Sequence, residues 1–250
     1  MPGLPAVDLQ GRVGLVAGGA HGIGAAIAES LGSAGAEVMV ADADREDLER
    51  MEARSSFATF ECDFANPVRV VELFGAVKER FGRLDVLVCA QRRRPPSRPL
   101  LEISFDEYRR TLATNLDASF LCVQQAARQM VDAGAGGRIV LVSSINAVAA
   151  RRGEADHEVS QAALRGLVKA AAVELAGARI TVNAIVPGVV RTDAPDAELE
   201  SIAASPLNPS GMVGEPADVA RAALWLVDPD NAYVTGSLVV VDGGQTSVLP

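Results

Sequence analysis

Several residue types that carry chemistry are scarce in this 250-residue sequence. It holds two lysines, two histidines and two tyrosines, so arginine supplies nearly all of the positive charge. With two histidines, a metal site built from several imidazoles is not expected. The three cysteines, Cys62, Cys89 and Cys122, are odd in number and each lies in an apolar run, which predicts reduced, buried thiols.

An excess of basic residues and long hydrophobic runs are also lacking. The formal net charge of −9 argues against nucleic acid or an anionic membrane as a partner. No apolar stretch approaches the length of a membrane span, and the first residues lack the basic and apolar segments of a secretory signal. We therefore expect a cytoplasmic protein. Its length and 49% hydrophobic content predict one domain, residues 1–250.

The segment 12–42 organises the rest of the chain. An apolar run at 13–17 predicts a buried strand, and the apolar stripe that follows predicts a helix. The turn between them has the spacing G-x-x-x-G-x-G, and its candidate binding residues are Gly18, His21, Gly22, Ile23 and Gly24. Such glycines let the backbone approach a pyrophosphate, toward which the helix directs its free N–H groups. This context predicts a dinucleotide cradle, and a glycine-rich turn without a ligand is the alternative.

An acidic residue follows the next strand. The apolar run Val38–Val40 leads into Asp42, whose carboxylate could accept both ribose hydroxyls of an adenosine and would repel a 2′-phosphate. We therefore predict NAD(H) as the cofactor, and not NADP.

Strand-like and amphipathic stretches alternate along the remaining chain. The strand-like runs lie at 57–62, 85–89, 138–142, 180–186 and 237–241. The amphipathic stretches lie near 45–53, 67–80, 105–131, 158–176 and 216–227. This order predicts an α/β fold with a doubly wound parallel sheet and helices on both faces. Because ligands bind beyond the carboxyl ends of such strands, the residues after each strand are candidates for the site.

Two of these strand ends carry candidate residues with open alternatives. Asp63, followed by Phe64, could accept a hydrogen bond from an adenine amino group, or it could cap a helix. Ala90 precedes four arginines between residues 92 and 98. These arginines could hold an anionic substrate or carrier group, and a solvated, proline-rich loop explains them equally well.

Further candidates come from the second half of the chain. They are Asn115 on an apolar helix, Ser144 after the fifth strand, and Pro187, Gly188 and Thr192 after the sixth. The segment 193–214, rich in alanine, proline and serine, is long enough to be a lid over a substrate.

In this order, the motifs resemble the short-chain dehydrogenase/reductase superfamily. The resemblance extends from about Leu9 to Gly244 and ends on the motif Asp242-Gly243-Gly244. It implies a single Rossmann domain with a seven-stranded parallel sheet and a small-molecule substrate. It also implies a homotetramer or homodimer that assembles through the helices near 105–131 and 158–176 and through the C-terminal strand.

The resemblance further implies a catalytic Ser, a Tyr thirteen residues later and a Lys four beyond that. Counting from Ser144 places His157 and Gln161 at the Tyr and Lys positions. Neither lysine has a tyrosine four residues before it, so no Tyr-x-x-x-Lys occurs in the chain. The family's Asn-Asn-Ala-Gly after the fourth strand is also replaced, by the segment 89–92. We therefore expect a divergent member with an atypical active site.

His157 and Gln161 are chemically consistent as a pair. An imidazole titrates at about 6.5 and needs no cationic neighbour to act as a base, whereas a phenol titrates at about 10. A neutral Gln161 can still hydrogen-bond a ribose hydroxyl, and Asn115 and Ser144 remain able to orient a carbonyl or hydroxyl group. The alternative is that the site has decayed and that His157 is a partly exposed residue at a helix start.

Three functions follow from these residues. The first, which the loss of both Tyr and Lys favours, is an enzyme that uses His157 and Ser144 on a small carbonyl or hydroxy compound without net redox chemistry, by dehydration, isomerisation or cyclisation. The second is an NAD-dependent oxidoreductase with His157 as proton donor or acceptor. The third is a non-catalytic partner or NAD-sensing subunit.

Overall fold

Seven parallel strands form one sheet in the order β3-β2-β1-β4-β5-β6-β7 in the computed structural model, which describes residues 6–192, 199–200 and 203–248. The strands are β1 (Val13–Ala17), β2 (Glu37–Asp42), β3 (Ala58–Glu61), β4 (Val86–Cys89), β5 (Gly137–Val142), β6 (Ile180–Pro187) and β7 (Leu238–Val241). Each coincides with a predicted strand to within a residue or two. The predicted α/β fold is confirmed.

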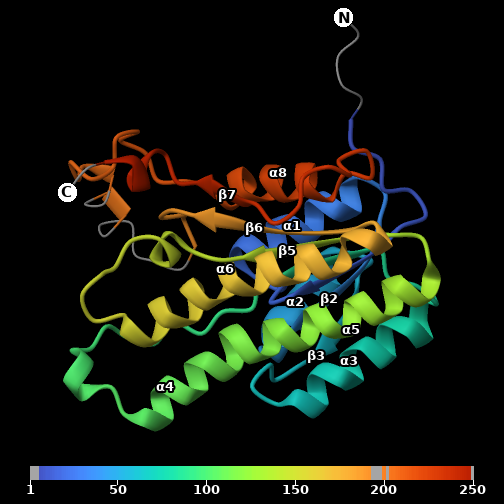
Figure 1. The fold of residues 1–250 in the computed structure, drawn as a ribbon, viewed down its shortest axis with the longest axis horizontal. Coiled ribbons are helices and arrows are strands. Elements are labelled where there is room, and N and C mark those ends of the chain that lie inside the picture. Colours follow the sequence, from blue (N-terminus) through green and yellow to red (C-terminus); the bar gives the residue numbers. More distant parts are fainter. Residues whose placement is uncertain (1–5, 193–198, 201–202, 249–250) are drawn as a thin grey trace, which may run out of the picture.

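Helices cover both faces of the sheet (Figure 1). One face carries α3 (Pro67–Phe81), α5 (Ala118–Ala133) and α6 (Ala155–Leu175), and the other carries α1 (Gly22–Ser33), α2 (Arg45–Arg54) and α8 (Pro216–Val227). The sheet is therefore buried on both sides, which is why its strands read as continuous apolar runs and not as alternating ones.

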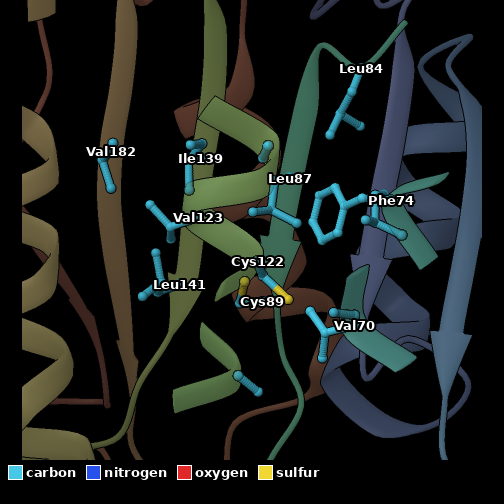
Figure 2. Packing of buried hydrophobic residues seen from close by; sticks show 14 of the residues in the cluster. Val70, Phe74, Leu84, Leu87, Cys89, Cys122, Val123, Ile139, Leu141 and Val182 are labelled. Carbon is cyan, nitrogen blue, oxygen red and sulfur yellow. The ribbon is translucent and has the colours of Figure 1, made fainter. Parts of the chain in front are cut away.

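The core on the α3 and α5 side is close-packed (Figure 2). The Phe74 ring lies beside Leu87 of β4, and Cys89 and Cys122 lie together between β4 and α5. All three cysteines are buried and none forms a disulfide, as predicted. Burial raises the pKa of Cys62 to about 12, so this thiol stays protonated and packs as an apolar group.

Local sequence signals set most helix boundaries. Asn66 caps α3, Pro67 occupies its first turn, and Gly82 ends it in the left-handed conformation. The predicted helix at 105–131 differs from the structure in one respect. It consists of α4 (Phe105–Leu112), a π-helical turn (Ala113–Asp117) and α5. A π-turn inserts one extra residue into the helix, which hydrophobic periodicity does not reveal.

The sheet order places a topological switch point between β1 and β4. The chain runs outward from β1 to β3 and then returns to place β4 on the other side of β1. The chain therefore continues from β1 and from β4 to helices on opposite faces of the sheet, and a crevice opens at its carboxyl edge. Among the described residues, no helix is both long and apolar enough to span a membrane.

Candidate functional site

A cavity of about 370 Å³ opens at this carboxyl edge of the sheet. Most of the predicted site residues line it: Gly18, His21, Gly22, Ile23, Gly24, Asp42, Phe64, Ala90, Ser144, His157, Pro187, Gly188 and Thr192. They end or follow the strands β1 to β6 or lie in the first turns of α1 and α6. The fold therefore brings together residues up to 174 positions apart, from Gly18 to Thr192.

The turn after β1 has no room for a side chain at Gly18 or Gly24. A Cβ atom on Gly18 would lie 2.3 Å from the backbone nitrogen of Gln91, and one on Gly24 would lie 1.9 Å from the carbonyl oxygen of Gly18. Gly18 also adopts a positive φ of 74°. Glycine at these positions lets the loops after β1 and β4 touch and the helix start directly at the sheet.

Helix α1 presents its N-terminus to the cavity. The first N–H groups of a helix have no partner inside it, and no side chain caps this end at His21. Gly22, Ile23 and Gly24 all line the cavity. Backbone donors combined with the helix dipole favour a phosphate group at this position, so the cradle fits the pyrophosphate of a dinucleotide.

Asp42 closes the same end of the cavity and is 6% exposed. Its carboxylate accepts hydrogen bonds from the Ala20 and Ala43 amides at 3.1 and 2.8 Å, and His21 Nδ1 lies 3.6 Å from it. Burial raises the pKa of Asp42, but the bonds from His21 and Ala20 outweigh burial and hold the pKa below its ordinary value. The Asp44 amide lies 3.4 Å from the same oxygen as the Ala43 amide. An ionised carboxylate on the cavity wall is a group to which ribose hydroxyls can donate hydrogen bonds.

His157 lies at the opposite end of the cavity, in the first turn of α6. Its side chain is buried, with 1% of its surface exposed, so the alternative of a partly exposed residue at a helix start is wrong. The ring atom Nδ1 is buried and has no hydrogen-bond partner among the described residues. A buried polar atom without a partner is costly, and a ligand or water that donates a hydrogen bond would remove the cost.

Charged neighbours also act on this imidazole. Burial, followed by the positive charges of Arg92 and Arg94, lowers the pKa of His157 to about 4, against the opposing effect of Glu154. The neutral Gln161 leaves the ring without a cation from its own helix, but not without cations from the rest of the fold. The sequence removes a lysine from the next turn of the helix, but the loop after β4 supplies two arginines in its place. At neutral pH the ring is uncharged.

A hydrogen-bonded chain connects Ser144 to this loop. Ser144 accepts a bond from the Asn146 amide at 3.2 Å, and Asn146 Nδ2 donates to Glu154 at 2.8 Å. Arg94 donates to the other Glu154 oxygen at 2.6 Å. Burial raises the pKa of Glu154, but Arg94 outweighs burial and keeps the pKa below its ordinary value. Glu154 is thus a buried, ionised carboxylate that accepts hydrogen bonds from both Arg94 and Asn146.

Sequence reasoning missed Asn146, Glu154 and Arg151. Glu154 is buried, and Asn146 and Arg151 line the cavity. The only available signal was a single carboxylate placed between two arginines and the start of α6. Such a pattern is also typical of a solvated helix start, so it does not identify a buried pair.

Two predicted residues, Asn115 and Gln161, are not part of the cavity wall. Asn115 lies in the π-turn, is 1% exposed, accepts a bond from the Arg93 amide at 2.7 Å and donates to the Arg93 carbonyl and to Ser160. Gln161 is buried one turn after His157, and its Oε1 has no partner among the described residues. Both side chains are therefore buried next to the site and do not face the cavity.

Two other predictions have different outcomes. Asp63 is exposed, does not line the cavity, and accepts a bond from the Ala65 amide, so its contact with adenine stays a prediction. The predicted lid at 193–214 falls partly outside the described residues, at 193–198 and 201–202. Within its described part, Leu199 is 1% exposed and lines the cavity.

Comparisons with known proteins agree with this architecture. A family model described as enoyl-(acyl carrier protein) reductase matches residues 18–246. The chain is 34% identical to a 2,5-dichloro-2,5-cyclohexadiene-1,4-diol dehydrogenase from Sphingobium indicum, over 96% of this chain and 99% of the relative. It is also 34% identical to D-threitol dehydrogenase from Mycolicibacterium smegmatis, over 95% of this chain and 94% of the relative.

A solved structure has the same fold. The short-chain type dehydrogenase/reductase from Mycobacterium marinum superposes with a TM-score of 0.90 at 32% identity, covering 96% of this chain and 98% of its own. The chain belongs to the short-chain dehydrogenase/reductase family. The family model spans the glycine turn, the strand ends and the cavity. The match therefore includes the regions that form the site of this short-chain dehydrogenase/reductase.

Proposed function

We propose that this short-chain dehydrogenase/reductase binds NAD(H) and oxidises a small hydroxy compound, with His157 and Ser144 at the reacting group. One observation carries the proposal: a single cavity joins the N-terminus of α1 and Asp42 at one end with Ser144 and His157 at the other. Phosphate and ribose contacts at the first end leave the second end for a substrate. The named relatives, a diol dehydrogenase and a threitol dehydrogenase, support the substrate class.

Asp42 supports NAD(H) over NADP(H). Its lowered pKa keeps the buried carboxylate ionised at neutral pH, so it would accept hydrogen bonds from ribose hydroxyls and repel a 2′-phosphate. We expect NADH to bind more tightly than NADPH. Asp42→Asn should reduce the ratio of NADH affinity to NADPH affinity about tenfold or more. The reason is that repulsion between two negative charges at close range costs on the order of 1–4 kcal/mol. Tighter binding of NADPH to the unaltered protein would contradict the assignment.

The chain supplies a proton acceptor for oxidation. The neutral His157 imidazole can accept the proton of a substrate hydroxyl, and Ser144 can orient the oxygen by a hydrogen bond. When bound, NAD⁺ would supply the acceptor for the hydride that leaves the carbon bearing this hydroxyl. At neutral pH the ring is uncharged, so one of its nitrogens carries no proton and can accept the one that the substrate hydroxyl releases.

Asn115 and Gln161 act as positioning residues in this scheme. Asn115 fixes the Arg93 backbone and Ser160 by hydrogen bonds, and Ser160 in turn donates to the His157 carbonyl at 2.6 Å. Gln161 Nε2 lies 3.5 Å from the Ser160 hydroxyl. These contacts hold the first turn of α6, and with it the imidazole, against the loop after β4.

A reaction without net redox chemistry is the second candidate function. It is favoured by the atypical pair His157 and Gln161, because the family's charged Lys would be missing from the nicotinamide ribose. In that case His157 and Ser144 would carry out dehydration, isomerisation or cyclisation while the dinucleotide stays unchanged. A non-catalytic subunit is a third candidate, which a cavity that extends past the glycine turn to Ser144 and His157 disfavours.

The decisive experiment follows nicotinamide reduction and substrate loss in the same reaction. The full-length protein is incubated with NAD⁺ and a panel of small diols, polyols and hydroxy acids. Oxidation predicts equal amounts of NADH and carbonyl product, and His157→Gln should reduce turnover at least a hundredfold with unchanged NADH binding. Product formation without NADH would support the second candidate, and unchanged turnover of His157→Gln would refute both roles of the imidazole.

We further propose that copies of the chain assemble through α5 and α6. Large apolar side chains are exposed on α4, α5 and α6, among them Phe105, Phe120, Val159 and Val173, which is 81% exposed. Exposed apolar surface of this kind marks an interface between proteins. Light scattering should give a dimer or tetramer, and Val173→Asp should shift the mass toward the monomer. A monomeric unaltered protein would contradict this assembly.

A further inference from the structure

His21 lies between two carboxylates at the dinucleotide end of the cavity. Its Nδ1 atom is 3.6 Å from Oδ2 of Asp42 and 3.6 Å from Oδ2 of Asp47. Asp42 ends β2, and Asp47 lies in the first turn of α2. His21 and Asp42 both line the cavity, and His21 directly precedes α1. An imidazole on the glycine turn therefore faces carboxylates from two other elements.

Neither helix capping nor packing explains an imidazole at this position. The His21 side chain makes no cap bond to α1 and is 52% exposed. Both carboxylates also have other partners, since Asp42 accepts bonds from backbone amides and Oδ1 of Asp47 pairs with Arg50. What the imidazole adds at this end of the cavity is a positive charge that is present only when the ring is protonated.

Other charged groups on the surrounding elements are carboxylates and guanidinium groups. The segment after β6 reaches the same turn, because a Cβ atom on Gly22 would lie 3.1 Å from Thr192. The charged groups on the two sides include Asp44, Asp47 and Arg50 of the α2 side, and Arg191 with its partner Glu215 after β6. Carboxylates titrate near 4 and guanidinium groups above 12, whereas an imidazole titrates at about 6.5. Among these described groups, the imidazole is therefore the type that changes charge near neutral pH.

We propose that His21 determines how strongly this end of the cavity discriminates between NADH and NADPH, because its protonated imidazole offsets the charge of Asp42. The inference rests on the proposed function, since it needs the adenosine ribose to lie against Asp42. A 2′-phosphate on that ribose meets the carboxylate at any neutral pH. It meets a neighbouring cation only when His21 is protonated, so the preference for NADH weakens as the pH falls.

Two other groups have to be distinguished from His21 as the source of such a pH dependence. The first is Asp42. Burial raises its pKa, but the bonds from His21 and the Ala20 amide outweigh burial, so the carboxylate stays ionised in the neutral range. The second is the 2′-phosphate itself, which takes up a proton at about pH 6 and then repels Asp42 less. Variants of His21 separate the imidazole from the phosphate, because the phosphate titrates in every variant.

The test measures the ratio of NADH affinity to NADPH affinity of the full-length protein by fluorescence titration, at about pH 6 and about pH 8.5. His21→Asn removes the charge at both pH values, and His21→Arg keeps it at both. At the lower pH the ratio for the unaltered protein should be about tenfold below that for His21→Asn, and at the higher pH the two ratios should agree. His21→Arg should give the low ratio at both. The matched control Glu49→Gln removes a carboxylate of α2 that pairs with Arg45, and it should keep the unaltered pH dependence.

Two results would overturn the inference and leave the proposed cofactor standing. The first is a ratio that changes with pH by the same factor in the unaltered protein and in His21→Asn, which would assign the pH dependence to the phosphate. The second is equal ratios for His21→Arg and His21→Asn, which would mean that a charge at this position does not reach the 2′-phosphate. If neither dinucleotide binds to the unaltered protein, the proposed function is refuted and this inference with it.

Discussion

The buried imidazole of His157 predicts a measurable dependence of stability on pH. In the folded protein the pKa of His157 is about 4, whereas an imidazole in an unfolded chain titrates near 6.5. Between these values the unfolded state binds a proton that the folded state does not. Folding stability therefore rises with pH through this range, is complete above about pH 6.5 and is lost as pH falls toward 4.

The size of the effect follows from the two pKa values. A difference between 6.5 and about 4 corresponds to about 3 kcal/mol of the free energy of unfolding. Because the side chain is 1% exposed, solvent screening reduces this value little. A loss of about 3 kcal/mol is a large fraction of the 5–15 kcal/mol that typically stabilises a domain.

Urea unfolding at pH 8 and at pH 4.5 measures this contribution. Several carboxylates also titrate in the acid range, so the informative quantity is the difference between variants. His157→Gln removes the titrating group and should lose about 3 kcal/mol less than the unaltered protein between the two pH values. Ser160→Ala is the matched control. It deletes a buried hydroxyl that donates to the His157 carbonyl, so it should destabilise the protein at both pH values and keep the unaltered pH dependence.

Parallel stability curves for His157→Gln and the unaltered protein would refute this reasoning. They would mean that the imidazole titrates alike in the folded and unfolded states, and hence that burial and the two arginines do not act on it. A direct measurement is also simple, because the chain has only two histidines and their ring protons can be assigned with single variants.

Three further predictions concern the scaffold and the site. Gly24→Ala should cost more than about 3 kcal/mol of stability, because its Cβ would lie 1.9 Å from the Gly18 carbonyl oxygen. Gly75→Ala is the matched control: its Cβ meets no atom within 4 Å, so it should stabilise α3 by up to about 1 kcal/mol. Thermal unfolding measures both changes. Asp85→Asn should cost about 3 kcal/mol in the same assay, since the buried carboxylate accepts bonds from two arginines and a backbone amide; an unchanged melting temperature would contradict this. Glu154→Gln should lower turnover by altering kcat more than KM, because it releases Arg94 and Asn146 without touching the substrate; equal changes in both would argue against a positioning role.

Most of the fold was predictable from local patterns. The apolar runs, the glycine turn and the caps act over a few residues, so period and composition identify them without knowledge of the tertiary structure. The grouping of Gly18, Gly22, Gly24 and Asp42 at one end of the cavity was predictable for the same reason, because the glycines form one continuous turn and Asp42 follows the next strand. The π-turn at Ala113–Asp117 was not predictable, since it leaves no mark on the hydrophobic pattern.

The environment of His157 is the clearest limit of the sequence. Counting residues identified the imidazole and the neutral Gln161 one turn away, which describes only the neighbours on the same helix. The fold adds neighbours from another segment, because the loop after β4 lies near α6 and Arg92 and Arg94 act on the ring.

The α/β alternation, the glycine turn and the absence of a Tyr-x-x-x-Lys pair can be read from the amino-acid sequence, because each is a property of neighbouring residues. The charges that surround Ser144 and His157 follow only from how the chain folds. Arg94 and Glu154 are 60 positions apart, yet they form one ion pair behind Ser144. Electrostatic interactions depend on distance in space and on burial, and neither quantity is encoded in the spacing of residues along the chain.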